Sequence, residues 1–305
     1  MTPDEYTNQE LMLEVGNGHT LYVQDWGNKT AKNVIFFLHG GPGNGCRDKH
    51  KLAFDPKTQR VIFHDQRGSG KSLPKGRWHH NTTQDLSEDI TRIADKLKIR
   101  KFAVTGNSWG STLSLYYAIN NPERVSAVVI SGVFTATKWE IDWINKGLFA
   151  SHFPDAWERY ALTVPKTHRS NPTSYHMKRA FGKDTAKAAE SIRIFSDLET
   201  SVVSLNDRHA PTPALDYDPS GAFIEMRYLS KGCFMPERYI LKNAGKITMP
   251  LYIVQGRYDF VCPPTTAYDL STLAPNAHLT WVTAGHSAEH ETVTAMSLIY
   301  SMLTI

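Results

Sequence analysis

Short apolar runs rich in β-branched residues alternate with amphipathic stretches in the first third of the chain. Runs with strand character cover residues 19–26, 33–38, 60–63 and 102–104, and each is short enough to be one strand of a buried sheet. A helical pattern of apolar positions covers residues 83–97. Strands that alternate with helices are typical of an α/β protein, so we predict a mostly parallel central sheet.

The pattern changes after Gly132. The next part of the chain is rich in aromatic residues and helix formers and has few β-branched runs. Strand character returns at residues 251–254 and 279–282, and a closing helix is expected from about Glu291. We therefore predict an α/β core in two sequence pieces with an inserted helical cap. The predicted boundaries are 1–135 and 242–305 for the core and 136–241 for the cap domain.

The segment KFAVTGNSWGSTLSLYYA, residues 101–118, has Ser108 at the centre of a GxSxG motif. A serine between two glycines is by default a turn residue, so the motif alone is weak evidence. Its context is stronger, because a β-prone run precedes it and a helix-compatible stretch follows it as far as Pro122. In a nucleophile elbow the glycines leave room for a strained turn that sets the serine hydroxyl at a helix N-terminus. We therefore predict that Ser108 is a nucleophile.

A nucleophilic serine needs a base within hydrogen-bond reach, and the base needs a group that fixes its tautomer. After an elbow of this kind, the expected order along the chain is Asp or Glu and then His. Of the 13 histidines, His286 follows the strand-like run 279–282, and Asp259 follows the run 251–254 in the same way. Both are expected at the carboxyl edge of the sheet, where active sites of open α/β sheets gather. Taken alone, Asp259 fits a structural role, as a turn residue or a helix cap before Pro263, as well as it fits a catalytic one.

Backbone N–H groups that stabilise an oxyanion require a close approach of the chain to the substrate. The glycine-rich turn FLHGGPG, residues 37–43, follows an early strand, and taken alone it is a tight strand-to-helix loop. Together with the elbow it predicts an oxyanion hole formed by the backbone N–H groups of Gly41 and Trp109. A second glycine-rich segment, DQRGSGKS at residues 65–72, lacks the GxxxxGKS or GxxxxGKT spacing of a phosphate-binding loop. No nucleotide site is predicted there.

Composition narrows the setting of this site. The 34 basic and 30 acidic residues give a formal net charge of +4 and form no run of like charges, so we expect no nucleic-acid partner. A polar N-terminus and the lack of an apolar run of about 18 residues predict no signal peptide and no membrane span. The three cysteines have no CxxC spacing, so they indicate neither a disulfide framework nor a zinc site, and we expect a cytoplasmic protein. The serine mechanism itself needs no metal or organic cofactor. Cys262 is expected to be a small buried residue. The oligomeric state stays open.

The motifs HGGPG, DQRGSG, GNSWGS, GRYDFVCP and AGHS occur in this order, and over nearly its whole length the chain resembles the prolyl iminopeptidases. These are serine aminopeptidases of the α/β-hydrolase fold that release N-terminal proline. The resemblance includes the cap segments SGVFTATKWEIDWI and HFPDAWERY. It implies an α/β-hydrolase fold with Ser108 as nucleophile, Asp259 as orienting acid and His286 as general base and then acid. It also supports Gly41 and Trp109 as oxyanion donors.

The resemblance further implies that two cap glutamates bind the free amine of the substrate, Glu199 in SDLET and Glu225 in FIEMRY. An N-terminal amine is largely protonated near neutral pH, and a cation that enters a partly dry pocket needs carboxylate partners. Two neighbouring carboxylates repel each other, and the incoming ammonium relieves that repulsion. Without the resemblance, each glutamate would be interpreted as a solvated charge on a helix face.

Two departures from the family pattern concern the side-chain pocket. Near the first glutamate the family has tryptophans where this chain has Phe195 and Leu198. After the second glutamate, Leu229 stands where the family has an aromatic residue of the wall that packs on the proline ring. Phe134 matches another aromatic residue of that wall. We therefore predict an intact amine site beside a pocket that is less selective for proline.

Together these patterns predict a serine exopeptidase that releases the N-terminal residue, preferentially proline, from peptides with a free N-terminus. The reaction passes through an acyl-enzyme. The alternatives are an aminopeptidase of broader specificity, an amidase or esterase of the same fold, and a catalytically silent binding protein. Epoxide hydrolases and dehalogenases of this fold use an aspartate at the elbow, so Ser108 argues against them.

Overall fold

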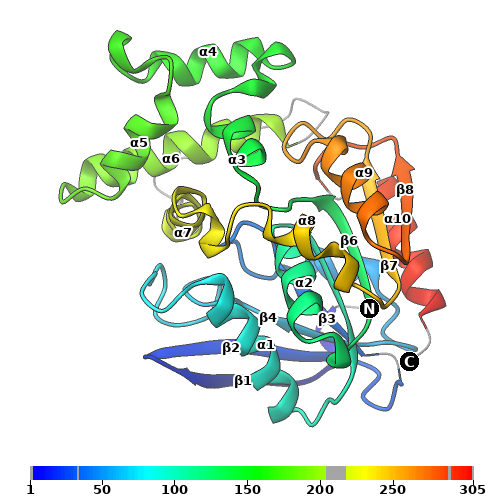
Figure 1. Ribbon diagram of the computed structural model, residues 1–305. Coiled ribbons are helices and arrows are strands. Elements are labelled where there is room, and N and C mark those ends of the chain that lie inside the picture. The colour runs from blue at the N-terminus through cyan, green and yellow to red at the C-terminus, as the bar shows by residue number, and fades with distance from the viewer. Residues whose placement is uncertain (1–2, 33, 204–217, 288–289, 304–305) are drawn as a thin grey trace.

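A central sheet of eight strands, in the order β1-β2-β4-β3-β5-β6-β7-β8, runs through the described part of the chain (Figure 1). The computed structural model describes residues 3–32, 34–203, 218–287 and 290–303. The strands are Thr7–Gly16 (β1), His19–Gly27 (β2), Val34–Leu38 (β3), Arg60–His64 (β4), Phe102–Ser108 (β5), Val125–Val133 (β6), Leu251–Gly256 (β7) and Ala277–Val282 (β8).

Parallel pairing dominates this sheet. Strands β3 to β8 pair parallel with one another, whereas β2 pairs antiparallel with both β1 and β4. The register sets Phe36 of β3 beside Ile62 and Val104, and sets Ile35 beside Val61 and Ala103. Each set contributes to a separate hydrophobic cluster, because successive side chains of a strand point to opposite faces. Both faces are therefore buried, as in other parallel sheets, and the predicted fold class is confirmed.

Helices cover the two faces unequally. Helices α1, α2, α8 and α9 contribute buried side chains to the larger hydrophobic cluster on one face, and α10 contributes to the cluster on the other face. The helices are Thr83–Lys96 (α1), Trp109–Asn120 (α2), Lys138–Asn145 (α3), Pro154–Leu162 (α4), Pro172–Ala180 (α5), Thr185–Val202 (α6), Ser220–Ser230 (α7), Tyr239–Asn243 (α8), Pro264–Leu273 (α9) and His290–Met302 (α10). Short 3-10 turns cover Pro3–Tyr6, Asp48–Ala53, Pro122–Arg124, Leu148–Ser151, Lys166–His168, Gly232–Phe234 and Ala244–Lys246.

Helices α3 to α7 follow β6 and stand beyond the edge of the sheet at the top of Figure 1. They have two hydrophobic clusters of their own, one joining α3, α4 and α6 and the other joining α5, α6 and α7. The first turn of α7 touches the glycine-rich turn 37–43 of the core. A Cβ at Gly43 would lie 2.4 Å from the Gly221 carbonyl oxygen. The predicted cap boundaries at 136 and 241 stay a prediction, and residues 204–217 lie outside the described residues.

Two elements were absent from the sequence-based expectation. Strand β1 has Leu11, Leu13 and Val15 on the face that packs against the larger cluster, and its hairpin turn has positive φ at Asn17 and Gly18. Alternating apolar residues followed by Asn-Gly are a strong hairpin signal. Helix α9 follows Pro263 and is short, with only Ala267 and Leu270 as buried apolar residues within its bounds.

Candidate active site

Ser108 lies at a strained junction between β5 and α2. Its φ is 59° and its ψ is −127°, a conformation that L-amino acids rarely adopt and that clusters at functional sites. The neighbouring glycines make the junction feasible, because a Cβ at Gly106 would lie 2.5 Å from the Gly110 backbone. A Cβ at Gly110 would lie 2.1 Å from the Leu38 carbonyl oxygen. The strand, sharp turn and helix expected around Ser108 are therefore all present.

Asp259 and His286 meet at the carboxyl edge of the sheet, after β7 and β8. The His286 Nδ1 atom lies 2.9 Å from Asp259 Oδ2 and 3.1 Å from Oδ1. Backbone N–H groups of Val261 and Cys262 donate to Asp259 Oδ1, and the Gln255 amide donates to Oδ2. Burial alone would lower the pKa of His286, but the charge and hydrogen bond of Asp259 raise it above its ordinary value. The carboxylate thus fixes the Nδ1-H tautomer and leaves Nε2 as the basic nitrogen.

The surroundings of Ser108 come from the core and from the loop after β7. A Cβ at Gly40 would lie 3.4 Å from Ser108 Cβ, so the glycine-rich turn runs directly past the serine. The Ser108 hydroxyl contacts the thiol of Cys262, whose pKa is raised by burial. Among the described residues, no hydrogen bond joins the Ser108 hydroxyl to His286. Catalytic hydrogen bonds are often long or poorly aligned before substrate binds and tighten in the substrate complex.

The glycine-rich turn is held in place by His39 and Gln66, both buried. His39 Nδ1 donates to the Gly40 carbonyl at 2.9 Å, while its Nε2 accepts from the Gln66 backbone N–H at 3.0 Å. The Gln66 side-chain amide donates to the His39 carbonyl, and its oxygen accepts from the Trp109 indole N–H, both at 2.9 Å. Gln66, in the segment 65–72, therefore links the turn that carries Gly41 to Trp109, the residue after Ser108. The sequence alone predicted no role for this segment.

The two cap glutamates, Glu199 on α6 and Glu225 on α7, lie together beside this edge. Their half-buried carboxyl groups share a hydrogen bond, and the Glu199 carboxyl interacts electrostatically with His286. Burial raises the pKa of Glu199 to about 7. Burial and the neighbouring Glu199 charge raise the pKa of Glu225 well above its ordinary value. Residues far apart in the sequence are thus assembled into one acidic pair next to His286.

The four residues of the predicted side-chain pocket have different surroundings. Phe134, after β6, and Leu229, on α7, are half-buried and pack against the larger hydrophobic cluster. Phe195 and Leu198 are buried in the two cap clusters. Those two residues therefore contribute to the packing of α6.

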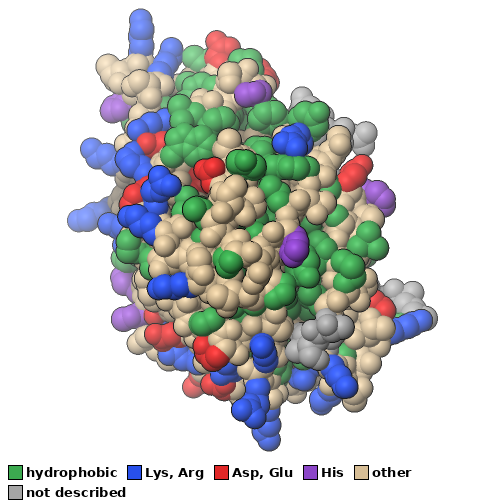
Figure 2. Space-filling model, turned by 45° about the vertical axis from the view of Figure 1, so that its right-hand side comes forward, with side chains coloured by type: hydrophobic (Ala, Val, Ile, Leu, Met, Phe, Trp, Pro, Cys, Tyr) green, Lys and Arg blue, Asp and Glu red, His purple; other side chains and the backbone are tan. Residues whose placement is uncertain are grey.

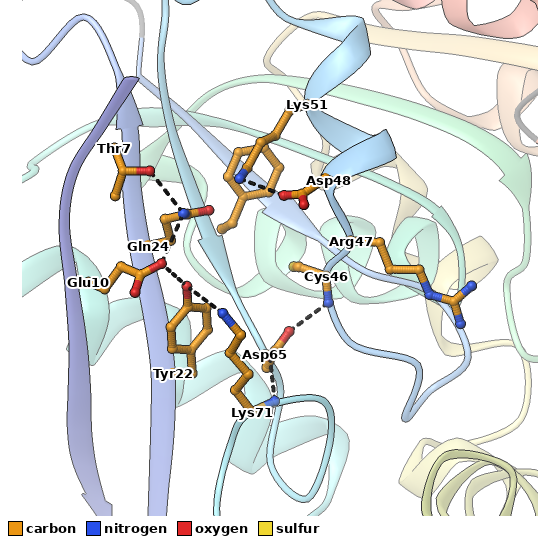
Figure 3. A pocket seen from close by; sticks show the side chains of 11 residues that line it. Thr7, Glu10, Tyr22, Gln24, Cys46, Arg47, Asp48, Lys51, Asp65 and Lys71 are labelled. Atoms are coloured by element: carbon orange, nitrogen blue, oxygen red, sulfur yellow. Dashed lines mark hydrogen bonds and ion pairs between the residues drawn. The ribbon is translucent and has the colours of Figure 1, made fainter. Parts of the chain in front are cut away.

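A separate polar pocket of about 560 Å³ lies between β1, β2 and the chain after the glycine-rich turn (Figure 3). None of the predicted site residues lines it. Gln24 donates to Glu10, Lys51 pairs with Asp48, and Asp65 accepts two backbone N–H groups. Its charged groups therefore largely bind one another.

The described residues have neither a cluster of metal ligands nor a helix suited to crossing a membrane. Over those residues, no three or more His, Cys, Asp or Glu side chains are grouped so that they would bind a metal ion. None of the helices in the described ranges combines the length and the apolar character needed to span a bilayer. On the face drawn in Figure 2, basic side chains are interspersed with acidic ones, and hydrophobic side chains are spread across the upper and central part.

Known proteins resemble this chain in both sequence and fold. A profile of the alpha/beta hydrolase fold matches residues 33–291. The chain is 38% identical over 283 residues to a proline iminopeptidase of Xylella fastidiosa, covering 91% of this chain and 90% of that protein. It is 38% identical over 291 residues to a proline iminopeptidase of Arabidopsis thaliana, covering 93% of this chain and 76% of that protein.

Solved structures resemble the fold at low sequence identity. A proline iminopeptidase of Mycobacterium smegmatis superposes with a TM-score of 0.63 at 18% identity, covering 96% of this chain and 98% of that one. An esterase of Exiguobacterium antarcticum gives 0.61 at 18% identity, with the same coverage. The fold is therefore shared by enzymes of different activities, and the sequence relationship is what narrows the family. The chain is a hydrolase that belongs to the proline iminopeptidase family of the alpha/beta hydrolase fold.

Proposed function

We propose that this protein is a serine exopeptidase that releases the N-terminal residue, preferentially proline, from peptides. The observation that carries the proposal is the pair of hydrogen-bonded carboxyl groups of Glu199 and Glu225 next to His286. An esterase or amidase has no need for two acids at this place, because their burial is costly unless a cation joins them. A peptide with a free N-terminus supplies such a cation one bond from the Cα atom that carries the scissile carbonyl.

The proposed reaction begins at Ser108. Its Oγ attacks the carbonyl carbon of the first peptide bond, and His286 Nε2 accepts the hydroxyl proton while Asp259 stabilises the imidazolium. The backbone N–H groups of Gly41 and Trp109 stabilise the oxyanion. His286 then gives the proton to the leaving amine, the C–N bond breaks, and the shortened peptide departs. Water, deprotonated by His286, attacks the ester carbon. The bond from that carbon to Ser108 Oγ then breaks as His286 returns the proton to Oγ, and the amino acid leaves.

In this proposal the side chain of the released residue packs against Phe134 and Leu229. Leu229 offers branched aliphatic carbons where an aromatic face would pack on a pyrrolidine ring. We therefore propose a preference for proline that is less strict than an all-aromatic wall would impose. An aminopeptidase of broader specificity, and an amidase or esterase, are the alternatives.

Residues 1–135 and 242–305 are proposed as the catalytic core and 136–241 as the cap that supplies the amine site. Peptides with a free N-terminus are the proposed partners. The cysteines Cys46, Cys233 and Cys262 are all free. Free thiols are typical of reducing compartments, and we propose a cytoplasmic location on that basis.

A panel of aminoacyl 4-nitroanilides tests the proposed function. We expect the prolyl substrate to have the highest kcat/KM, with small apolar residues within about tenfold, because one aliphatic contact in a pocket discriminates weakly. Acetylation of the amine is expected to abolish turnover of every member. Equal turnover of free and acetylated substrates would show that the protein is an amidase. Equal kcat/KM for all free aminoacyl substrates would show that it is an aminopeptidase of broad specificity.

The pH dependence of the reaction follows from the groups that hold protons. Glu199, with a pKa of about 7, and the coupled Glu225 lose their shared proton as the pH rises, and only then do they bind an ammonium fully. His286, with its raised pKa, acts as a base only when neutral. We therefore expect kcat/KM for prolyl 4-nitroanilide to fall toward acid pH with a limiting slope near two, because the acidic pair and His286 must each lose a proton. It falls again when the substrate amine loses its proton near pH 8.

An activated ester without an amine, 4-nitrophenyl cyclopentanecarboxylate, provides the comparison. It depends on His286 and not on the acidic pair, so its kcat/KM is expected to fall with a slope near one on the acid side and to show no loss near pH 8. Identical profiles for the two substrates would contradict the role of the acidic pair.

A further inference from the structure

We propose that the loop of residues 65–82, between β4 and α1, positions both halves of the active site. Through Gln66 it sets the oxyanion donors, and through Asn81 it sets Tyr228 and the amine-binding helix α7. The inference rests on the proposed function, since it takes Glu225 as an amine ligand. The structure supports it with a continuous set of buried hydrogen bonds that begins at Arg67.

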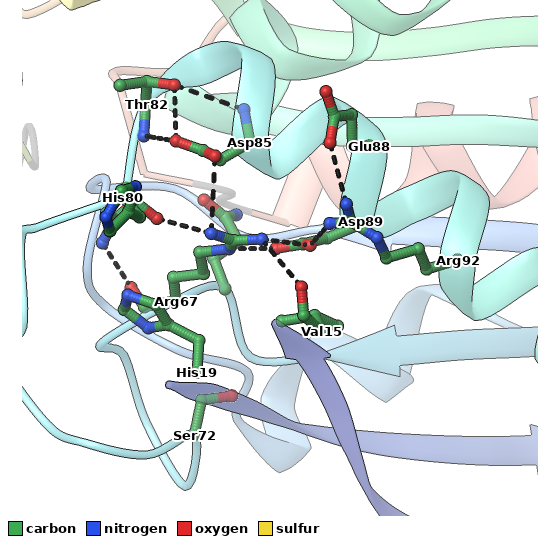
Figure 4. A network of polar contacts seen from close by, with 12 residues as sticks. Val15, His19, Arg67, Ser72, His80, Thr82, Asp85, Glu88, Asp89 and Arg92 are labelled. Carbon is green, nitrogen blue, oxygen red and sulfur yellow. Dashed lines mark hydrogen bonds and ion pairs between the residues drawn. The ribbon is translucent and has the colours of Figure 1, made fainter. Parts of the chain in front are cut away.

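Arg67 anchors the loop. Its side chain is fully buried and forms a two-pronged pair with Asp89 of α1, with Nε 2.6 Å from Oδ2 and Nη2 2.7 Å from Oδ1 (Figure 4). Its Nη1 donates to the His80 carbonyl at 2.5 Å. A bidentate arginine–carboxylate pair has a fixed relative orientation. One side chain therefore ties the beginning of the loop to its end and ties both to α1.

Glycines allow the loop to turn inside this frame. Gly70 has a φ of 52°, and a Cβ there would lie 2.2 Å from Asp65 Oδ2. That carboxylate accepts the backbone N–H groups of Cys46 and Lys71 at 2.6 and 2.7 Å. The DQRGSG motif thus has a partner for each of its first three side chains, Asp65, Gln66 and Arg67.

One arm of the loop reaches helix α7. The Asn81 amide donates to the Arg67 carbonyl at 2.9 Å, and the Asn81 oxygen accepts from the Tyr228 hydroxyl at 3.0 Å. Tyr228 is buried and lies one helical turn after Glu225. Gly68 comes so close to Ile224, the residue before Glu225, that a Cβ would lie 2.8 Å from its Cδ1. Both contacts fix the height and rotation of α7 at the turn that carries Glu225.

The other arm reaches the oxyanion donors. Gln66 binds the His39 backbone and the Trp109 indole at the same time. The Tyr228 ring packs edge-on against the Trp109 ring, with centroids 4.8 Å apart. Tyr228, which holds the amine-binding helix, therefore also touches the side chain of Trp109. The backbone N–H of Trp109 is one of the two proposed oxyanion donors.

An exopeptidase needs such a link because its two anchor points on the substrate are close. The ammonium nitrogen and the scissile carbonyl carbon are bonded to the same Cα atom, so the carboxylates and the oxyanion donors must keep one fixed separation. A misplacement of about 1 Å costs roughly 100-fold in rate. The carboxylates are on the cap and the donors are on the core, and the loop 65–82 joins the two.

The test is Tyr228→Phe, which removes only the hydroxyl that binds Asn81. We expect KM for prolyl 4-nitroanilide to rise about tenfold, the size of one buried hydrogen bond, with kcat changed less than twofold. Turnover of 4-nitrophenyl cyclopentanecarboxylate is expected to stay within twofold. The matched control is Tyr117→Phe, because Tyr117 is also buried and its hydroxyl contacts Thr91 away from the site. It is expected to leave KM for both substrates unchanged.

A double-mutant cycle separates positioning from general stability. If Tyr228 acts through Glu225, Tyr228→Phe adds less than twofold to KM in a Glu225→Gln background.

For the other arm, Trp109→Phe removes the indole N–H that binds Gln66, and kcat is expected to fall about tenfold on both substrates. Asn81→Ala gives a second way to break the α7 contact and is expected to reproduce the KM effect of Tyr228→Phe.

Three results overturn the inference. The Tyr228 hydroxyl serves stability alone if Tyr228→Phe lowers kcat/KM equally for the amine substrate and the ester. The same holds if Tyr117→Phe raises KM for prolyl 4-nitroanilide as much as Tyr228→Phe does. If its effect is fully additive with Glu225→Gln, Tyr228 does not act through Glu225. Failure of the proposed function is distinguishable, because Glu225→Gln would then leave the preference for the free amine unchanged.

Discussion

Replacing Ser108 by alanine is expected to lower kcat on prolyl 4-nitroanilide by roughly 10⁴-fold or more, because it removes the proposed nucleophile. KM is expected to change little, since the amine and side-chain contacts remain. The strained φ of 59° at Ser108 is a cost that a plain turn serine would not carry. The measurement is steady-state turnover together with labelling by a fluorophosphonate probe.

The control for this variant is Ser271→Ala. Ser271 lies on α9, and its hydroxyl donates to the Tyr268 carbonyl. It is expected to retain wild-type turnover and probe labelling, while Ser108→Ala loses both. Turnover above about 1% of wild type in Ser108→Ala would show that a different group attacks the carbonyl.

Replacing Glu225 by glutamine is expected to lower kcat/KM for the prolyl substrate about 100-fold, almost entirely through KM. The variant keeps the shape of the side chain and removes one of two charges that face the ammonium in a partly dry site, where such a loss is large. The ester without an amine is expected to be hydrolysed at the wild-type rate or slightly faster. The selectivity for a free amine is therefore expected to fall by the same factor.

Glu158→Gln is the matched control. Glu158 is exposed on α4 of the cap, so its substitution changes net charge equally without touching the acidic pair. Glu199→Gln is expected to act in the same direction as Glu225→Gln. An unchanged KM in both site variants would remove the glutamates from substrate binding and leave an esterase or amidase as the better assignment.

Local chemistry made part of this site predictable from the sequence. Ser108 stands between two glycines, and a side chain at either of them would collide with neighbouring backbone. Asp259 and His286 each follow a strand-like run that forms a strand in the structure. Such signals are contained within a few residues. The glutamates depended on the family resemblance, because nothing in the sequence around Glu199 distinguishes it from an exposed helical charge.

The positioning residues depend on long-range contacts. Gln66 lies 43 positions from Trp109, and Asn81 lies 147 positions from Tyr228. A polar residue in a glycine-rich loop has many acceptable partners, and only the folded arrangement decides which one it binds. For the same reason, nothing local in the segment 65–72 predicts that Gln66 binds Trp109.

The contact between Gly43 and Gly221 has a consequence for how such enzymes diversify. Backbone meets backbone there, so a side chain at either position would push α7 away from the core. A cap transplanted from another hydrolase would therefore need a glycine at the start of its last helix before it could lie at the same distance from the nucleophile. New specificities in this lineage are expected to arise by changes within α3 to α7, and wholesale exchange of the cap is disfavoured.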